Sequence, residues 1–458
     1  MSILLFMVEQ INWLLLLIVS GACGLALFIS KFYLGENTQS KPSASKTESI
    51  SKKGKFHSDM NAPPPEPTPL YIKPEEVSNR DDRPWRPFRV PYHQTMSIFK
   101  LDINHWLDMD KYYVHYIEEK KRVFHTYGNE HIGWNPESTE ACNELLDTVK
   151  KHLLKRYPLL FTTEDDGLHV KNELTGEVLD FTEPLKDHPL VYVSKMAKED
   201  FYILQKDSDG EYRLAAAAVP FPGGSFKISE KIGKTVDAIH DVVPYYAEKL
   251  RTSMLRFFDK MAPADPVERA SFYISWDHRL LLNNIYAMKE GEKVDSSVLP
   301  TEFNVRVERQ TLRRLPKTKA IIFTNHPIFY SIDEMKDEPL VPSLLRKILD
   351  EAPEKIMKYK NFDAFREHLV PYLDGLIQRQ KDLGLIDDDT PVRTLPTYPF
   401  AHFTKDYDEK TGWSNPKYPH NYSNKLQDEI QAAIPLEQSA FGTPTAARAA
   451  RADNLLAA

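Results

Sequence analysis

The spacing of apolar residues divides much of the chain into helical and extended segments. Helices are predicted where apolar residues recur about every 3.6 positions, at 104–124, 136–157, 229–260, 264–291, 341–350, 352–359 and 361–383. Strands are predicted where apolar and polar residues alternate, as hairpins at 169–181 and 200–221 and as single strands at 304–314 and 320–329. Short strands between flanking helices favour an α+β body with an antiparallel sheet.

An uncharged apolar run lies near the N-terminus. Residues 11–30 contain no Asp, Glu, Lys or Arg, and a helix of this length spans roughly 30 Å, the hydrocarbon thickness of a bilayer. A secretory signal peptide is the alternative, but its apolar part usually has about 7–15 residues and follows a basic segment. Lysines follow the run, from Lys31 to Lys55, which favours a cytoplasmic location for the rest of the chain. We therefore expect a single-pass membrane anchor, with the endoplasmic reticulum as the default membrane.

Composition changes after this predicted anchor, which we assign to residues 1–30. Residues 31–82 are rich in Pro, Ser and Lys and predict a flexible tether. The folded domain is expected at 83–385. Residues 386–458 are predicted to form an irregular extension with a disordered end.

Charge and cysteine content argue against several classes of function. The net charge of -7 gives no general attraction to nucleic acid, so no nucleic-acid partner is expected. The two cysteines, Cys23 and Cys142, cannot supply a four-thiolate iron–sulfur cluster. The sequence GKT at 233–235 lacks the earlier glycine of a phosphate-binding loop, because Ile228 stands in its place.

Charged residues on the predicted strand at 304–314 form the first candidate site. Arg306, Glu308 and Gln310 share one face of such a strand, and Arg309 points to the other. Valines alternate with these residues, so the charges are expected to be half-buried and therefore paired. Two interpretations stay open at this point: a structural ion-pair network, or a pocket in which arginine binds the carboxylate of a ligand.

His240 is the second candidate. It follows Ile239 in the segment IHDVVP and is one of 15 histidines in the chain. A histidine beside apolar residues is more often a satisfied core or surface residue than a metal ligand. Its position alone therefore does not decide between these roles.

Four segments together resemble the haem-dependent oxidative N-demethylase alpha-subunit family. They are DFYILQKDSDGEYRLAAAAVPFP, KISEKIGKTVDAIHDVVPYYAEKL, ASFYISWDHRL and FNVRVERQTLRRLPKTKAIIFTNHPIFYSIDEM. Their order and spacing match the family over residues 85–385, and VERQTLRRLP at 307–316 is the most specific part. Two places differ: FPGGSFK has Phe226 near a position where the family often has tryptophan, and Ile274-Ser275-Trp276 replaces an Asn-Trp pair.

The resemblance implies a PAS-like sheet that holds haem b, and dioxygen-dependent removal of an N-methyl group from a small amine with release of formaldehyde. It implies that His240 is the axial ligand of the haem iron. It further implies that Arg309, Gln310 and Arg313 bind the cofactor, and that Glu308 and Arg306 are catalytic. In this scheme Glu308 handles a proton or binds an ammonium group, and Arg306 holds charge near the iron.

The chain has no flavin or nicotinamide fingerprint, so electrons are expected from a separate reductase. A membrane anchor beside a membrane-bound reductase would raise the effective concentration of the two partners. Two alternatives stay open: a haem-binding sensor or carrier without turnover, and a relic of the fold with a structural charge network and no cofactor.

Overall fold

The computed structural model describes residues 59–417, except 225, 278, 282–290, 405–406, 410, 414 and 416. All described residues belong to one compact unit, Lys53–Ala458. The predicted anchor, the tether before residue 59 and the predicted disordered end lie outside the described residues. Within the described part, no helix is both long enough and apolar enough to span a membrane.

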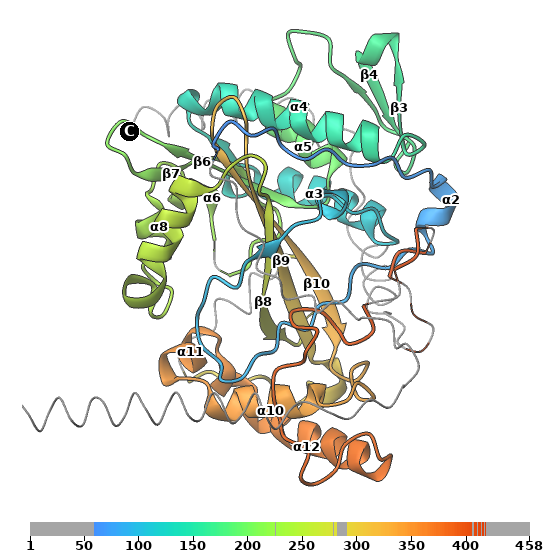
Figure 1. The fold of residues 1–458 in the computed structure, drawn as a ribbon, viewed down its shortest axis with the longest axis vertical. Coiled ribbons are helices and arrows are strands. Elements are labelled where there is room, and N and C mark those ends of the chain that lie inside the picture. The colour runs from blue at the N-terminus through green and yellow to red at the C-terminus, as the bar shows by residue number, and fades with distance from the viewer. Residues whose placement is uncertain are drawn as a thin grey trace, which may run out of the picture. The chain divides into compact units, whose positions relative to one another are not determined.

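A seven-stranded sheet forms the centre of the unit (Figure 1), and all of its neighbouring strands are antiparallel. Its order is β1 (Phe99–Lys100), β8 (Val267–Ser275), β9 (Asn304–Arg314), β10 (Ile321–Ser331), β6 (Asp200–Lys206), β7 (Tyr212–Ala218) and β2 (Ile132–Trp134). A smaller sheet has the order β3 (Phe161–Glu164), β4 (His169–Asn172) and β5 (Val178–Asp180). The predicted α+β class, both hairpins and the two long strands are therefore confirmed.

Strand β8 contradicts the helix predicted at 264–291. Its side chains alternate between the two faces of the sheet, and Phe272 and Ile274, two positions apart, are both buried in the core. β8 pairs with β9 from Val267↔Leu312 to Ser275↔Asn304. Over Val267–Ser275 the helix prediction was wrong, because pairing to both neighbouring strands outweighs a weak local helix signal. Residues 282–290 of the predicted helix lie outside the described residues.

The helix predicted at 229–260 is broken into α6 (Ile228–Lys231), α7 (Val236–His240), a π-helical turn (Tyr246–Leu250) and α8 (Arg251–Lys260). Gly233 adopts a φ of 79°, which ends α6. Pro244 has no backbone N–H to bond the His240 carbonyl, so α7 ends there. The helix predicted at 104–124 begins later, as α3 (Tyr113–Tyr127).

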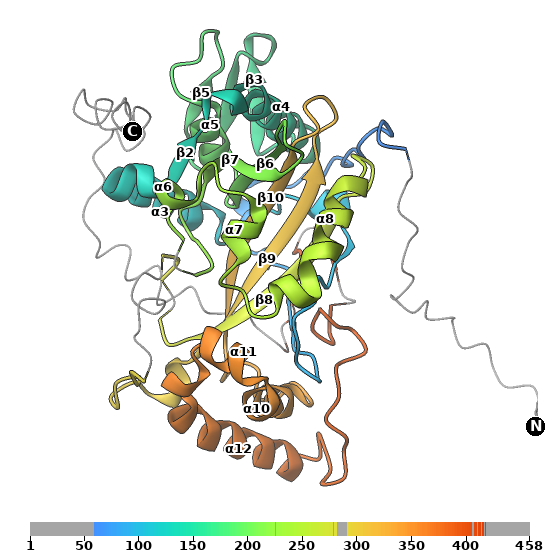
Figure 2. The same ribbon diagram turned by 90° about the vertical axis from the view of Figure 1, so that its left-hand side faces the viewer.

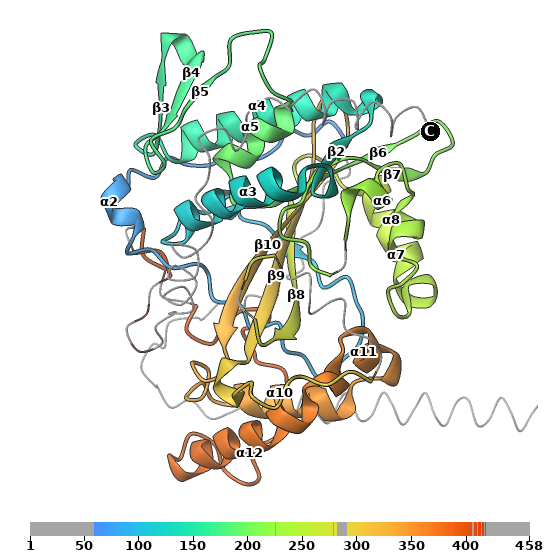
Figure 3. The same cartoon turned by 180° about the vertical axis from the view of Figure 1, so that it is seen from behind.

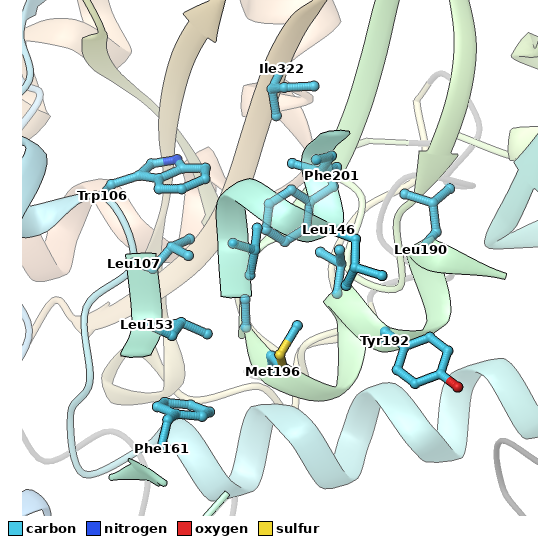
Figure 4. Close-up of a cluster of buried hydrophobic side chains, with 14 of the residues drawn as sticks. Trp106, Leu107, Leu146, Leu153, Phe161, Leu190, Tyr192, Met196, Phe201 and Ile322 are labelled. Carbon is cyan, nitrogen blue, oxygen red and sulfur yellow. The ribbon is translucent and has the colours of Figure 1, made fainter. Parts of the chain in front are cut away.

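Helices α3, α4 (Thr139–Arg156) and α5 (Pro189–Met196) lie together at the end of the molecule that contains β6 and β7 (Figure 3). Leu146 and Leu153 of α4 pack with Phe201 and Ile322 of the sheet in one apolar core, shown in Figure 4. This face of the sheet also carries Arg309, and we call it the α4 face.

Helices α7 and α8 lie over the opposite face (Figure 2), which we call the α8 face. Val236 and Phe258 of these helices pack there against Leu312 and Ile321. At the far end of the long strands lie the predicted helices α10 (Val341–Glu351), α11 (Glu354–Tyr359) and α12 (Arg366–Asp382). A short helix, α2 (Pro74–Val77), precedes the sheet, and the described residues after 385 form no helix or named strand.

Candidate active site

The charged run is buried in the middle strands of the large sheet. Arg306 and Glu308 are 0% and 1% exposed. Pairing of β9 with β10 places Arg306, Glu308 and Gln310 on the α8 face and Arg309 on the α4 face, as the alternation of a strand requires. The predicted strand and its division between two faces are confirmed, but the charges are fully rather than half-buried.

Arg306 and Glu308 form an ion pair in which Arg306 Nε donates to Glu308 Oε1 at 2.5 Å. The guanidinium also donates to the carbonyl oxygens of Leu280 at 2.7 Å and Phe221 at 3.0 Å. Asn325 Nδ2 donates to the second carboxylate oxygen of Glu308 at 2.6 Å. Arg306 thus binds protein groups on several sides and fixes Glu308 in one orientation.

Gly223 allows the chain to cross directly over Glu308. A Cβ atom added to Gly223 would lie 2.9 Å from Glu308 Cδ, a distance that real Cβ atoms essentially never show, and a tight 3.1 Å from its Oε2. A glycine is therefore needed for this approach. The segment FPGGSFK, one of the two places where the chain departs from the family pattern, thus contacts the Glu308 carboxylate through Gly223. Phe226 of the same segment packs on Tyr202, with ring centroids 5.5 Å apart.

Asp200 is a second buried acid on the α8 face, and no motif in the sequence pointed to it. Asp200 pairs with Asn325, and Asn325 pairs with Gln310, so Asp200 and Glu308 face the same way. Its carboxylate accepts from Phe221 N at 3.1 Å. Burial raises the pKa of Asp200 well above its usual value; the charge of Glu308 adds to this shift and Lys120 opposes it.

His240 ends α7 and is half-buried. Its Nδ1 donates to the carbonyl oxygen of Val236 at 2.8 Å, so the neutral ring carries its lone pair on Nε2. The ring stacks on Tyr246 with centroids 5.2 Å apart. Burial lowers the pKa of His240, and the charge of Arg269 lowers it further. A neutral, oriented imidazole of this kind suits a metal ligand.

Arg269 acts electrostatically on His240 and lies beside the charged strand. It lies on β8 opposite Gln310 and therefore points to the α8 face. Its Nε is buried and has no hydrogen-bond partner within the described residues. Burial also lowers the pKa of Arg269, although nearby tyrosines, among them Tyr273 and Tyr398, oppose this shift. An unsatisfied buried guanidinium donor is costly, and a carboxylate ligand would satisfy it.

Lys360 is a further buried cation that sequence reasoning missed. Its Nζ donates to the Phe272 carbonyl at 2.6 Å and lies 4.2 Å from the ring centroid of Tyr273. Burial lowers the pKa of Lys360 to about 7, although the charge of Glu308 opposes this shift. Lys360 is therefore only partly charged at neutral pH.

Lys360→Met is expected to reduce the pH dependence of stability. The folded pKa of about 7 lies below the unfolded value of about 10.4, so between these values the unfolded chain binds more protons and the free energy of unfolding rises with pH. As the pH rises across this window, we expect the free energy of unfolding of wild type to increase by on the order of a few kcal/mol more than that of Lys360→Met.

Urea unfolding at several pH values measures this difference. Lys355→Met, which removes an exposed lysine from α11, the helix that Lys360 follows, is the control and should keep the wild-type slope. Equal slopes for wild type and Lys360→Met would contradict the prediction.

Arg309 and Arg313 lie on the α4 face, away from Glu308. Arg309 Nη2 is 3.5 Å from Glu268 Oε2 and also donates to the His105 carbonyl. The guanidinium of Arg313 lies 4.0 Å from the ring centroid of Trp106, and burial lowers the pKa of Arg313 to about 10. Arg309 and Arg313 are therefore on the face of the sheet opposite to Arg306, Glu308 and Gln310. The five residues do not line a single pocket.

The Trp276 region, the second departure from the family pattern, belongs to the core. Trp276 packs on Phe303 and Phe365, with both pairs of ring centroids 6.1 Å apart. Among the residues that the structure describes, no group of three or more His, Cys, Asp or Glu side chains is placed to bind a metal ion. A haem iron needs only one or two protein ligands, so this finding does not bear on His240.

A model of one protein family matches the part of the chain that contains these residues. The family model described as "Haem-dependent oxidative N-demethylase, alpha subunit-like" matches residues 97–370. This is more than half of the 458 residues. The match contains the whole α8 face with His240, Arg269 and Glu308, and it confirms the resemblance noted in the sequence.

Proposed function

Because the chain belongs to the haem-dependent oxidative N-demethylase, alpha subunit-like family, we propose that it is a haem-dependent oxidoreductase that removes an N-methyl group from a small amine with dioxygen. The observation that carries the proposal is a buried, fully oriented carboxylate, Glu308, on the same sheet face as the unsatisfied donor of Arg269. A purely structural network would satisfy its buried donors.

The residues on the α8 face fit a haem. The Nε2 lone pair of His240 would bind the iron, and the orphaned Nε of Arg269 would donate to a propionate. Ile239 and Met254 belong to the apolar cluster beside these residues and suit a macrocycle. When bound, haem b would supply the iron centre at which dioxygen is reduced.

Glu308 is our candidate for the residue that contacts the substrate. A buried carboxylate can hold an ammonium group or pass a proton to or from the amine. Arg306 and Asn325 act through Glu308 by fixing its two oxygens, so we propose both as positioning residues. Arg306 would therefore influence the substrate site indirectly, by keeping Glu308 ionised and in place.

The overall reaction defines which partners are needed. Removal of one methyl group as formaldehyde consumes one dioxygen, two electrons and two protons, and yields the shortened amine and water. We propose that a separate reductase delivers the electrons, and that the anchor at 11–30 would hold the chain near it on the cytoplasmic side of a membrane.

Haem titration and formaldehyde release test this proposal. The full-length chain, reconstituted with haem, is expected to give a Soret band. With a reductant and dioxygen it should release formaldehyde from at least one of methylamine, dimethylamine and trimethylamine. A Soret band without formaldehyde would support a sensor or carrier instead. No Soret band would overturn both functions.

A further inference from the structure

Arg313 is a buried cation on the α4 face that lacks a protein acceptor. Its side chain is 4% exposed. Its Nε has no hydrogen-bond partner, and its guanidinium forms no ion pair within the part of the chain that the structure describes. Arg314, the next residue of β9, is 5% exposed. Each of its nitrogens nevertheless donates to a protein oxygen, among them the carbonyls of Met261 at 2.7 Å and Lys319 at 2.6 Å. Burial alone therefore does not explain the unpaired guanidinium of Arg313.

Two further unpaired nitrogens lie beside Arg313. The guanidinium carbon is 4.0 Å from the ring centroid of Trp106, which is fully buried. The ring of His152 meets the same indole edge-on, with centroids 5.1 Å apart. Neither Trp106 Nε1 nor His152 Nε2 has a hydrogen-bond partner among the described residues. Unpaired nitrogens from β9, from α4 and from the segment between β1 and α3 are thus gathered around one indole ring.

All three groups can donate a hydrogen bond, and one of them is charged. Indole and guanidinium nitrogens are donors only. Burial lowers the pKa of His152 well below its usual value, and the charges of Arg313 and Arg156 lower it further, against that of Asp108. The imidazole is therefore neutral and can carry its proton on Nε2. Water could accept some of these bonds but would leave the charge uncompensated, whereas an anion would accept them and neutralise the guanidinium.

Two acids that act electrostatically on this group are engaged elsewhere. The charge of Glu144 acts on Arg313. Its carboxylate, however, accepts from the backbone N–H of Lys317 at 2.7 Å and from that of the following residue at 2.8 Å. Asp108 is paired with His105 at 3.1 Å. A buried cation whose counter-charge the protein does not supply is costly, so the counter-charge is expected from outside the chain.

The surroundings of this group are apolar, which restricts the kind of anion. Leu107, Leu153 and Ile322 are fully buried in the same core as Trp106 (Figure 4), and Ile322 pairs with Arg313 across the sheet. Moving an ion from water into apolar surroundings costs more for a doubly charged phosphate than for a singly charged ion. The core therefore favours a small monovalent anion such as chloride.

We propose that Arg313, Trp106 and His152 bind a small monovalent anion within the α4 face. The anion accepts from the three unpaired nitrogens and supplies the counter-charge that the guanidinium lacks. Because the three residues come from different elements of the fold, binding ties β9, α4 and the segment before α3 together. The site lies on the face of the sheet opposite to Glu308, so the inference does not depend on the proposed function.

Thermal unfolding of the full-length chain in chloride, with gluconate as the replaced anion at constant ionic strength, tests the proposal. A ligand that binds only the folded chain raises its Tm. An increase in chloride to about 100 times its Kd should raise the Tm of wild type by on the order of a few °C. In Arg313→Met the Tm should not depend on chloride. In gluconate this variant should be at least as stable as wild type, because it removes an uncompensated buried charge.

Arg314→Met is the matched control. It removes the neighbouring buried arginine and leaves the carbonyls of Met261 and Lys319 without their donor, so its Tm should be lower than that of wild type in both salts. It should keep the chloride dependence of wild type, because its side chain does not take part in the proposed site. A wild-type Tm that does not respond to chloride, or an equal response in Arg313→Met, would overturn the proposal.

Bromide locates the ion directly in the wild-type chain, so this measurement decides even where a variant fails to fold. Anomalous diffraction from crystals of the full-length chain grown with bromide is expected to show a peak within hydrogen-bond distance of Arg313 Nε and Trp106 Nε1. Water at this position, with no bromide peak, would refute the site.

Discussion

The His240→Ala variant of the full-length chain is expected to lose its Soret band at stoichiometric haem and all formaldehyde release. Even the loss of a residue that only supports a metal ligand weakens binding by about 10–100-fold, and loss of the proposed iron ligand itself should weaken it more. The folded structure should tolerate the change, because His240 is half-buried and its ring donates to the carbonyl of Val236 within the same helix. Haem titration followed by absorption spectroscopy measures the effect.

Two controls distinguish a lost ligand from general damage. His131→Ala removes another histidine whose Nδ1 donates to a backbone carbonyl, that of Val219 at 2.8 Å, and it should keep the Soret band. Added imidazole should restore the band in His240→Ala by occupying the vacated position. Undiminished haem binding in His240→Ala would refute the ligand assignment and leave the carboxylate site to be explained separately.

Glu308→Gln is expected to have the second large effect, on both stability and turnover. The substitution leaves the Arg306 guanidinium buried without its counter-charge, which costs about 3–5 kcal/mol. It also removes the proposed contact to the substrate, and kcat/KM should fall by about 100-fold or more. Denaturant unfolding and formaldehyde assays, performed where both proteins are fully folded, measure the two effects.

The matched control for this variant is Glu338→Gln. Glu338 is also 1% exposed and accepts from a buried arginine, Arg86, whose Nε lies 2.9 Å away. Glu338→Gln should lower the free energy of unfolding by a similar amount and leave turnover unchanged. Equal losses of activity in both variants would mean that Glu308 acts through stability alone.

A double variant, Arg306→Met with Glu308→Leu, decides between the two interpretations of the charged run. Replacement of a whole buried ion pair by apolar side chains is often neutral for stability. Recovery here should be partial, because the carbonyl oxygens of Leu280 and Phe221 lose a donor. If the pair is only structural, activity should return with stability. If Glu308 contacts substrate, activity should stay lost.

The sequence by itself determined the elements whose signals are local. Alternation along 304–314 predicted both the strand and the side chains that share a face, and the Asp-Gly turn predicted the hairpin of β6 and β7. The run VERQTLRRLP and the segment IHDVVP identified the family, which the match over 97–370 confirmed. The membrane anchor at 11–30 stays a prediction from hydropathy.

Only the tertiary structure decided which chemical groups meet. β8 was mistaken for a helix because its stability comes from pairing with β9, a contact that no local window contains. Asp200, Asn325 and Lys360 carry no motif, and they became candidates only when the fold brought them near Glu308. The alternation of side chains along β9, which was visible in the sequence, places Arg309 and Arg313 on the α4 face, opposite to Glu308. Sequence spacing shows which side chains share a strand face, but strand pairing and burial decide their partners, their protonation and thus their chemistry.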